Sequence, residues 1–510
     1  MNNTQKCFQS ACIYKASRKM RVEEECTLPD YCSDISRIIK TDAVPCITSK
    51  KVYVRDGQLF CDISGKVYFN IIYRTDNGGT ESYFVTSELF DSSKTDVSDV
   101  DADSVFAFAS VTTESSFCKV QSPRRISVRA DICLNIDVRA NSPFDFYEKG
   151  SDTVETVEKQ AEVMQIMSFK DEEIRLTEEI KLPKSCPPME RILYVGLSVS
   201  LENAKASDNG VSYWGNAGIS CIYIPEEGWD SGIHSFYQPI EVKGSIETED
   251  SISDAAVVAE LLPVGVEYEI LTDSLGENRI LKADICYSAH CLVEESCPIT
   301  LTEDIYGVGC KVTPIYEKGE LRKYIGTLRE DTAIREKLPL KREFSEVEGV
   351  ESKVTLRDTH FENGELYADC RVNISGIGVA EDDLSAISEV FDISVRLNLP
   401  AEVSGMSEGL GFDMSQWTGF TDASVSGDEL SVSFDLMTLA HIYKSVDATY
   451  VTDVSIEAQD THSDETVFCY PCDTDTLWTV GKRYGVGIRE LAEANSIAVG
   501  DKPKRVMLIP

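Results

Sequence analysis

The sequence lacks several features that define common protein classes. It contains no run of eighteen apolar residues, so no transmembrane helix is predicted. Residues 1–20 are polar and hold no apolar stretch like that of a secretory signal, so we expect a protein made and kept in the cytoplasm. No phosphate-binding loop, dinucleotide-binding glycine pattern or nucleophile elbow occurs. The five histidines are scattered singly. We therefore predict no enzyme, no catalytic residue, no metal site and no cofactor.

Positive charge is also scarce. The chain has 49 lysines and arginines against 87 aspartates and glutamates, which gives a formal net charge of −38. Nucleic-acid binding depends on neutralising phosphates with lysine and arginine, and anionic membranes attract basic segments. The balance therefore argues against both kinds of partner. An acidic surface mainly keeps a protein soluble, and it is compatible with a basic partner.

Disulfides are not expected, although the chain contains seventeen cysteines. The number is odd and no export signal is seen, which favours reduced thiols. Cys469 and Cys472 have redox spacing, but they follow a predicted strand instead of opening a helix, and no second pair completes a zinc site. Asp99, Asp101 and Asp103 lack the glycine and glutamate of a calcium-binding loop. We interpret the three aspartates as a solvated acidic loop.

An internal repeat of about 154 residues organises most of the chain. A Leu-Pro pair occurs at 28–29, 182–183 and 338–339. An Asp-Gly or Asn-Gly turn pair, followed three residues later by an aromatic residue, occurs at 56–57, 209–210 and 363–364. The second half repeats as well, at 125–133, 279–286 and, more faintly, 430–436. Coincidences in nearly the same register indicate three tandem domains.

Apolar and polar residues alternate within each unit. Segments 51–55 and 58–63 flank an Asp-Gly turn, and 66–73 is rich in β-branched and aromatic residues. Helical signals are short, as at 34–39. The predicted fold class is mainly β, with three tandem antiparallel β domains followed by a small βααβ domain. We place the domains at 17–147, 171–315, 331–458 and 465–510, and polar linkers at 148–160, 316–330 and 459–465.

The last forty-odd residues form a separate pattern. Asp475 is expected to cap a first helix, in which Leu477, Val480 and Tyr484 share one face and Gly485 suits a left-handed stop. A second helix ends near 495, and short strands at 466–470 and 505–509 flank the pair. Residues 465–510 hold six acidic and six basic side chains, so the net charge belongs to the rest of the chain.

This βααβ order, with its Asp-Thr-Leu-Trp start and Leu-Ile-Pro end, resembles the LysM domain. The resemblance implies a shallow groove that binds glycans containing N-acetylglucosamine, where backbone amides meet the N-acetyl group and apolar side chains cover the sugar. Two loops would line it: Thr474, Asp475, Thr476 and Leu477 on one side, and Asn495, Ser496, Ile497 and Ala498 on the other. Thr474 replaces a glycine of that family and another glycine is displaced to Gly500. A protein-docking surface is therefore the alternative.

The opening of the first repeat, at 23–35 and 38–43, resembles the SPOCS domain of spore-forming bacteria. Tandem SPOCS units that end in LysM resemble the SipL-like family of spore-coat morphogenetic proteins. This resemblance implies a non-catalytic scaffold in the mother cell that tethers a spore-coat basement protein at the forespore surface. Two alternatives stay open. One is a cell-wall protein that binds peptidoglycan and uses the β domains as passive spacers. The other is a LysM-bearing enzyme whose catalytic β domain is not recognised.

Overall fold

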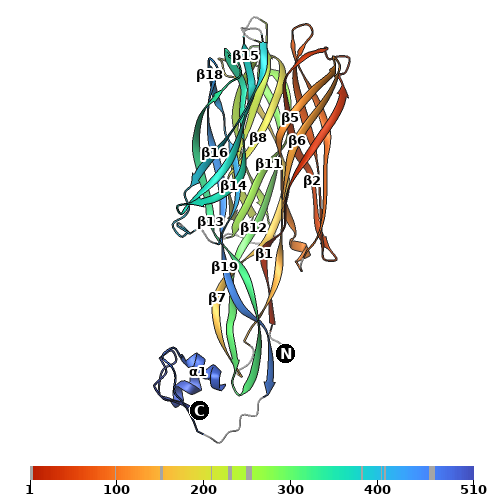
Figure 1. Cartoon of the computed structure of the whole chain (residues 1–510). Helices are drawn as coiled ribbons and strands as arrows, with labels where there is room; N and C mark the ends of the chain where they lie inside the picture. The colour runs from red at the N-terminus through yellow and green to blue at the C-terminus, as the bar shows by residue number, and fades with distance from the viewer. Residues whose placement is uncertain are drawn as a thin grey trace.

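The computed structural model describes residues 4–97, 99–149, 153–207, 210–227, 232–248, 255–380, 383–403, 405–406, 409–458 and 466–510. Antiparallel strands form nearly all of this part, and its two α-helices both lie in the last domain. The fold is therefore mainly β, as predicted. Neither helix is long and apolar enough to cross a membrane. Figure 1 shows an upper body of long strands, a narrower stalk beneath it and a small helical module at the foot.

Six strands form the first repeat: β1 (Thr4–Thr27), β2 (Ile35–Arg55), β3 (Gln58–Thr75), β4 (Thr80–Asp96), β5 (Phe106–Ser122) and β6 (Arg125–Tyr147). A 3-10 turn, η1 (Ala102–Ser104), precedes β5. The strands make two antiparallel sheets in the orders β1–β6–β5 and β2–β3–β4. Inward residues such as Phe69 and Ile71 of β3 and Ile126 and Ile132 of β6 share one buried cluster, so the sheets form a sandwich.

The second and third repeats use the same plan. The second contains β7 (Val154–Lys181), β8 (Met189–Ser207), β9 (Gly210–Pro225), β10 (His234–Glu247), β11 (Ala256–Thr272) and β12 (Asn278–Gly307). The third contains β13 (Cys310–Pro339), β14 (Glu346–Glu362), β15 (Glu365–Ala380), β16 (Asp383–Leu397), β17 (Leu410–Thr418), β18 (Asp422–Ser426) and β19 (Glu429–Ala458). In the third repeat β17 and β18 both pair with β19, in place of the single strands β5 and β11. The predicted three-fold repetition is confirmed.

The turn residues behave as the sequence indicates. Asp56 and Gly57 have φ angles of 51° and 71°, and Asn363 and Gly364 have 53° and 82°. Positive φ at both central residues is the geometry of a two-residue hairpin turn that matches the twist of its strands. Asn209, the first residue of the second turn pair, lies outside the described residues.

Two of the predicted linkers contain strand residues. Residues 154–160 belong to β7, and 316–330 lie inside β13. These segments are polar because the strands there leave the body and expose much of their surface. The helical signal at 34–39 is wrong, since it opens β2. The third predicted linker, 459–465, lies outside the described residues.

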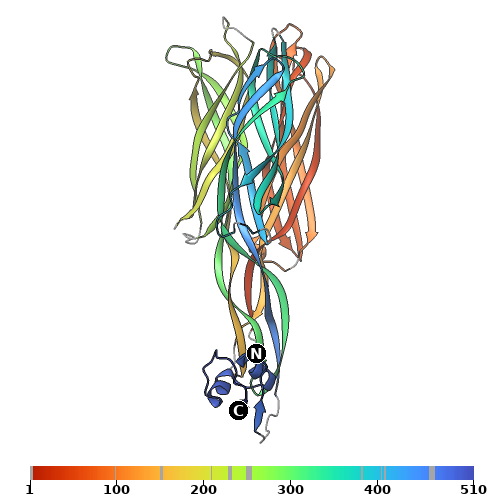
Figure 2. The ribbon, with the colours of Figure 1, turned by 60° about the vertical axis from the view of Figure 1, so that its left-hand side comes forward.

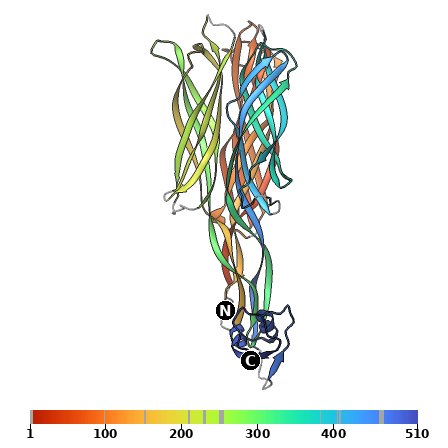
Figure 3. The ribbon, with the colours of Figure 1, turned by 90° about the vertical axis from the view of Figure 1, so that its left-hand side faces the viewer.

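The three repeats pack side by side in the body. Each repeat has one sheet whose outer face, on the side away from its own sandwich core, packs against the other repeats. These sheets are β2–β3–β4, β8–β9–β10 and β14–β15–β16. Ile39 and Ile72 of the first repeat meet Tyr194 and Ile222 of the second and Ile377 of the third in one buried cluster. Figures 2 and 3 show the strands of all three repeats standing alongside each other. The repeats therefore form one body, with apolar surface buried between them.

The stalk is made of three two-stranded ribbons. In each repeat the first and last strands, β1 with β6, β7 with β12 and β13 with β19, continue beyond the sandwich and twist around the other ribbons (Figures 1 and 3). Phe146, Leu301 and Tyr450, one from each ribbon, share a buried cluster. Isolated ribbons of two strands are marginally stable in water, so this shared core is what holds the stalk together.

A buried polar network lies where the ribbons leave the body. Glu294 of β12 is completely buried and accepts hydrogen bonds from the hydroxyls of Ser10 and Tyr443, which belong to the other two repeats. Asp413 of β17 binds the guanidinium groups of Arg139 at 2.7 Å and Arg322 at 2.9 Å. Burial raises the pKa of the Asp413 carboxyl, but attraction to these two arginines outweighs it and leaves that pKa below its ordinary value. The network thus joins side chains of all three repeats.

Removing Asp413 should destabilise the body strongly. Arg139 is 3% exposed, and breaking a buried pair leaves charge without adequate compensation. We expect Asp413→Ala to lower the free energy of unfolding by about 3 kcal/mol, measured by urea denaturation at neutral pH. Asp392→Ala, which removes an exposed partner of Arg371, is the matched control and should change little. Equal effects of the two substitutions would contradict a special role for the network.

His441 should make the stability of the body dependent on pH. Burial, which outweighs the attraction of Asp413, lowers the pKa of His441 from 6.5 to about 4. The unfolded chain takes up this proton at higher pH than the folded chain, so the stability due to the neutral ring is complete above pH 6.5 and falls as pH drops towards 4. We expect the unaltered chain to lose on the order of 3 kcal/mol of unfolding free energy over that range. His441→Asn, which can replace the contact of Nδ1 with Thr327, should abolish this loss. Urea denaturation at several pH values measures the free energy of unfolding, and identical pH profiles of the two chains would refute the prediction.

Candidate functional site

The terminal module has the predicted order of elements. Strand β20 (Val467–Cys469) is followed by α1 (Leu477–Tyr484), α2 (Ile488–Ala494) and β21 (Met507–Ile509), and β20 pairs antiparallel with β21. Leu477, Val480, Leu491 and Met507 form its buried core. Gly485 ends α1 in the left-handed conformation at φ 68°, as its position indicates.

Helix α1 follows the first loop of the predicted groove and begins one residue later than the sequence predicts. Thr476, not Asp475, is the N-cap, and its side chain and that of Thr479 close a reciprocal capping box. Asp475 accepts a hydrogen bond from the backbone of Cys472 at 2.9 Å and pairs with Arg483 at 2.9 Å. These contacts lower the pKa of the Asp475 carboxyl. Asp475 therefore fixes the loop in front of the helix.

The second loop of the predicted groove is built around Asn495. This side chain is buried, donates to the carbonyls of Leu491 and Leu508 at 2.9 and 2.7 Å, and accepts from the backbone of Leu508 at 2.7 Å. It holds the loop against β21, and Ser496 then turns the chain at φ 50°.

The eight predicted groove residues divide into supporting and exposed groups. Leu477 and Ile497 belong to or pack against the same core cluster, which brings the two loops to one apolar centre. The side chains that support the loops are Asp475, Leu477, Asn495 and Ile497. The exposed ones are Thr474, Thr476, Ser496 and Ala498. These four side chains are the most exposed of the eight, and we call them the rim of the predicted groove. Asp475 and Ile497 are partly exposed, and Thr476 also caps α1.

The module docks on the lower end of the stalk through contacts that the sequence did not reveal. The indole of Trp478 donates to Asp304 of β12 at 2.9 Å and lies edge-on to Tyr306, with ring centroids 4.8 Å apart. Lys482 forms an ion pair with the same carboxylate. The Tyr306 hydroxyl donates to the carbonyl of Val486 at 2.9 Å. The one available signal was that Trp478 lies off the apolar face of its helix.

Asp304 holds the centre of this interface. Burial alone would raise the pKa of its carboxyl, but hydrogen bonds from Lys482, Tyr316 and Trp478 outweigh burial and keep that pKa below its usual value. The groove rim stays exposed with the module docked, so docking fixes the orientation of the rim without covering it.

The other motifs singled out in the sequence have structural places. Cys469 is buried on β20, Cys472 is exposed, and all seventeen cysteines are free thiols. Asp101 caps the short turn η1 by accepting from the backbone of Asp103 at 3.2 Å, and Asp99 lies 3.7 Å from Lys6. Across the described ranges, no three histidine, cysteine or acidic side chains are grouped so as to hold a metal ion.

A cavity of about 580 Å³ lies between the repeats in the body. Several of its polar side chains already bond to neighbours: Ser220 donates to Glu351, and the hydroxyl of Ser352 lies 2.7 Å from that of Thr421. The first bond joins the second repeat to the third, and the second bond lies within the third repeat. The cavity is a concave site in the body, and its polar lining serves contacts within and between repeats.

Comparison with known proteins adds no assignment: no family model matches the chain, and neither curated proteins nor solved structures match it.

Asp304→Ala should weaken the docking of the module on the stalk without unfolding either part. The substitution removes the acceptor for Trp478 and Lys482, while the module core remains intact. We expect faster hydrogen exchange at the backbone amides of 484–488, measured by mass spectrometry, and unchanged exchange in α1 core positions such as Val480. Glu303→Ala, beside it in the sequence but paired with Lys159, is the matched control. Unchanged exchange at 484–488 would contradict the docking described here.

Proposed function

We propose that the chain is a non-catalytic scaffold of the spore envelope that tethers a coat-basement protein at the forespore surface, in the cytoplasm of the mother cell. The observation that carries this proposal is the exposed rim of Thr474, Thr476, Ser496 and Ala498 on a module fixed to the end of a stalk. A stalk that fixes the orientation of a groove suits attachment. The resemblance of the repeats to SPOCS units and of the module to LysM supports the spore setting.

Two details favour a protein partner over a glycan at this groove. Thr474 adds an exposed side chain at a place where LysM domains carry glycine. The Lys504 ammonium donates to the carbonyl of Asn495, so this backbone acceptor of the second loop is already engaged. Both features reduce the room and the free backbone groups available to an N-acetyl group. Peptidoglycan binding with passive β spacers is the second candidate, favoured by the βααβ fold of the module.

Enlarging two rim residues should abolish attachment. We expect the full chain with Thr474→Arg and Ala498→Arg, fused to a fluorescent protein, to lose most of the ring of signal around the forespore, because both side chains enter the groove from its exposed rim. Glu493→Arg changes an exposed position of α2 outside both loops and should keep the ring. Fluorescence microscopy through sporulation measures both.

The outcomes separate the candidates. Uniform cytoplasmic signal from the unaltered chain would refute the spore-envelope proposal. A ring that survives the double substitution would refute attachment through the groove. Co-sedimentation of the unaltered chain with purified peptidoglycan, lost in the double variant, would favour the glycan candidate.

A further inference from the structure

Each sandwich has a seam between its first and fourth strands, where the edges of the two sheets face each other. In the first repeat this seam, between β1 and β4, is closed by polar contacts. Arg18 pairs with Asp91 at 2.8 Å, and the hydroxyl of Tyr14 bonds that of Ser93 at 3.3 Å. Asp91 is buried, so the ion pair closes the seam on its inner side.

The third repeat lacks this ionic closure. Strand registers align Val22 with Ile334, because they face Ala130 of β6 and Phe434 of β19 at matching positions of the repeat. In this register Leu340, not Leu338 of the Leu-Pro pair, is the match of Leu28. Four residues earlier, Glu330 therefore stands where the first repeat has Arg18. The other edge of the seam is aligned by starting from the equivalent turn pairs at 56–57 and 363–364. Counting along the strand pairings from these turns, Asp91 of β4 corresponds to Ile393 of β16. A carboxylate and an isoleucine thus replace the arginine–aspartate pair.

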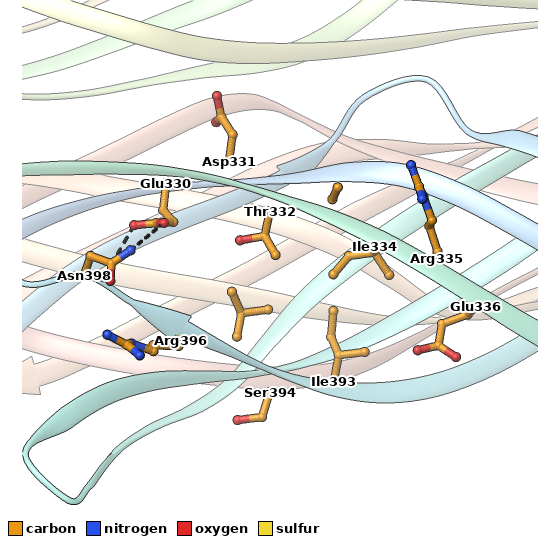
Figure 4. Close-up of a pocket in the computed structure, with 12 residues that line it drawn as sticks. Glu330, Asp331, Thr332, Ile334, Arg335, Glu336, Ile393, Ser394, Arg396 and Asn398 are labelled. Carbon is orange, nitrogen blue, oxygen red and sulfur yellow. Dashed lines mark hydrogen bonds between the residues drawn. The ribbon is translucent and has the colours of Figure 1, made fainter.

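An open groove of about 820 Å³ occupies this seam (Figure 4). It is lined by Glu330 to Glu336 of β13 and by Ile393 to Arg396 of β16. Ile334 and Ile393 are half-buried and pack against the core of the third repeat, so the groove floor is apolar. In the described part of the chain β13 pairs with β19 and β16 with β15, and each strand lies at the edge of its sheet. Such edges carry backbone groups that can pair with another strand.

The charges around the groove select its occupant. Glu330 is held by Asn398, whose amide donates to it at 2.8 Å, and Asp331 pairs with the neighbouring Arg329 at 3.3 Å. Glu336 adds a third carboxylate and Arg335 and Arg396 add two guanidinium groups, of which that of Arg396 pairs with Glu365 at 3.1 Å, so the lining carries a small excess of negative charge. The whole chain carries −38, so a second copy would meet strong repulsion. Basic side chains between apolar ones would instead complement both the rim and the floor.

We propose that this seam is a second docking site, independent of the terminal module, for an extended segment of a partner protein with alternating apolar and basic residues. The segment adds as a strand to the open edge, with its apolar side chains over Ile334 and Ile393 and its basic side chains towards the carboxylates. Backbone pairing holds the segment, and the alternation sets its register.

A labelled nine-residue peptide of alternating valine and lysine is the probe, and fluorescence anisotropy with the full chain is the measurement. We expect saturable binding of the peptide, at least tenfold weaker when serine replaces valine and at least tenfold weaker when glutamate replaces lysine. Glu330→Arg with Ile393→Asp copies the ionic closure of the first repeat and should weaken binding at least tenfold. Ile334→Lys, a single change on the groove floor, should have the same effect.

The reverse exchange gives an independent readout. Arg18→Glu with Asp91→Ile opens the first seam and should add one binding site to those of the unaltered chain. The unfolding midpoint of each variant, measured by circular dichroism, identifies those that keep the fold. Absence of saturable binding to the unaltered chain would overturn the proposal. The proposal would also be overturned if the serine peptide bound as tightly as the valine peptide. The same holds if the closed variant and Ile334→Lys both bound the peptide as tightly as the unaltered chain.

Discussion

In each repeat the first strand pairs with the last over nearly its whole length, and this pairing is the constraint from which the rest of the molecule follows. Thr4 faces Tyr147, Val154 faces Gly307, and Cys310 faces Ala458, so each repeat begins and ends at the same place. The next repeat must therefore start beside the previous one. Because the paired strands outrun their sandwiches, three ribbons emerge together and bury a shared core as the stalk. Body, stalk and module position are consequences of one strand pairing used three times.

The buried polar network gives this arrangement its specificity. A stalk core of aromatic and aliphatic residues would tolerate several rotations of the ribbons, since apolar contact has no direction. Glu294 and Asp413 are satisfied only when Ser10, Tyr443, Arg139 and Arg322 reach them from other strands. Buried ions contribute little net stability, but a wrong arrangement leaves them unpaired. The network therefore penalises alternative packings of the three repeats.

Local signals in the sequence predicted the local structure well. Alternation predicted the strands, the Asp-Gly and Asn-Gly pairs predicted two hairpin turns, and the repeat spacing predicted three units. Predictions failed where tertiary contacts decide. Residues 316–330 read as a linker because a ribbon strand is largely exposed, and only pairing with β19 makes it a strand. In the terminal module, the sequence indicated that the loops at 474–477 and 495–498 meet, but not that Asn495 braces the fold or that Trp478 binds the stalk. The role of Trp478 depends on Asp304, which lies far away in the sequence, and the role of Asn495 depends on the position of β21, so no local pattern indicates either.

The central proposal is that the chain attaches to its partner through the rim of a module held at a fixed orientation. The most direct test is a photo-crosslinking amino acid placed at position 474 of the full chain in sporulating cells, with position 493 on the outer side of α2 as the comparison. The account predicts a discrete protein adduct from position 474, resistant to peptidoglycan-degrading enzymes, and none from position 493. An adduct that these enzymes remove, or one formed only from position 493, would contradict it.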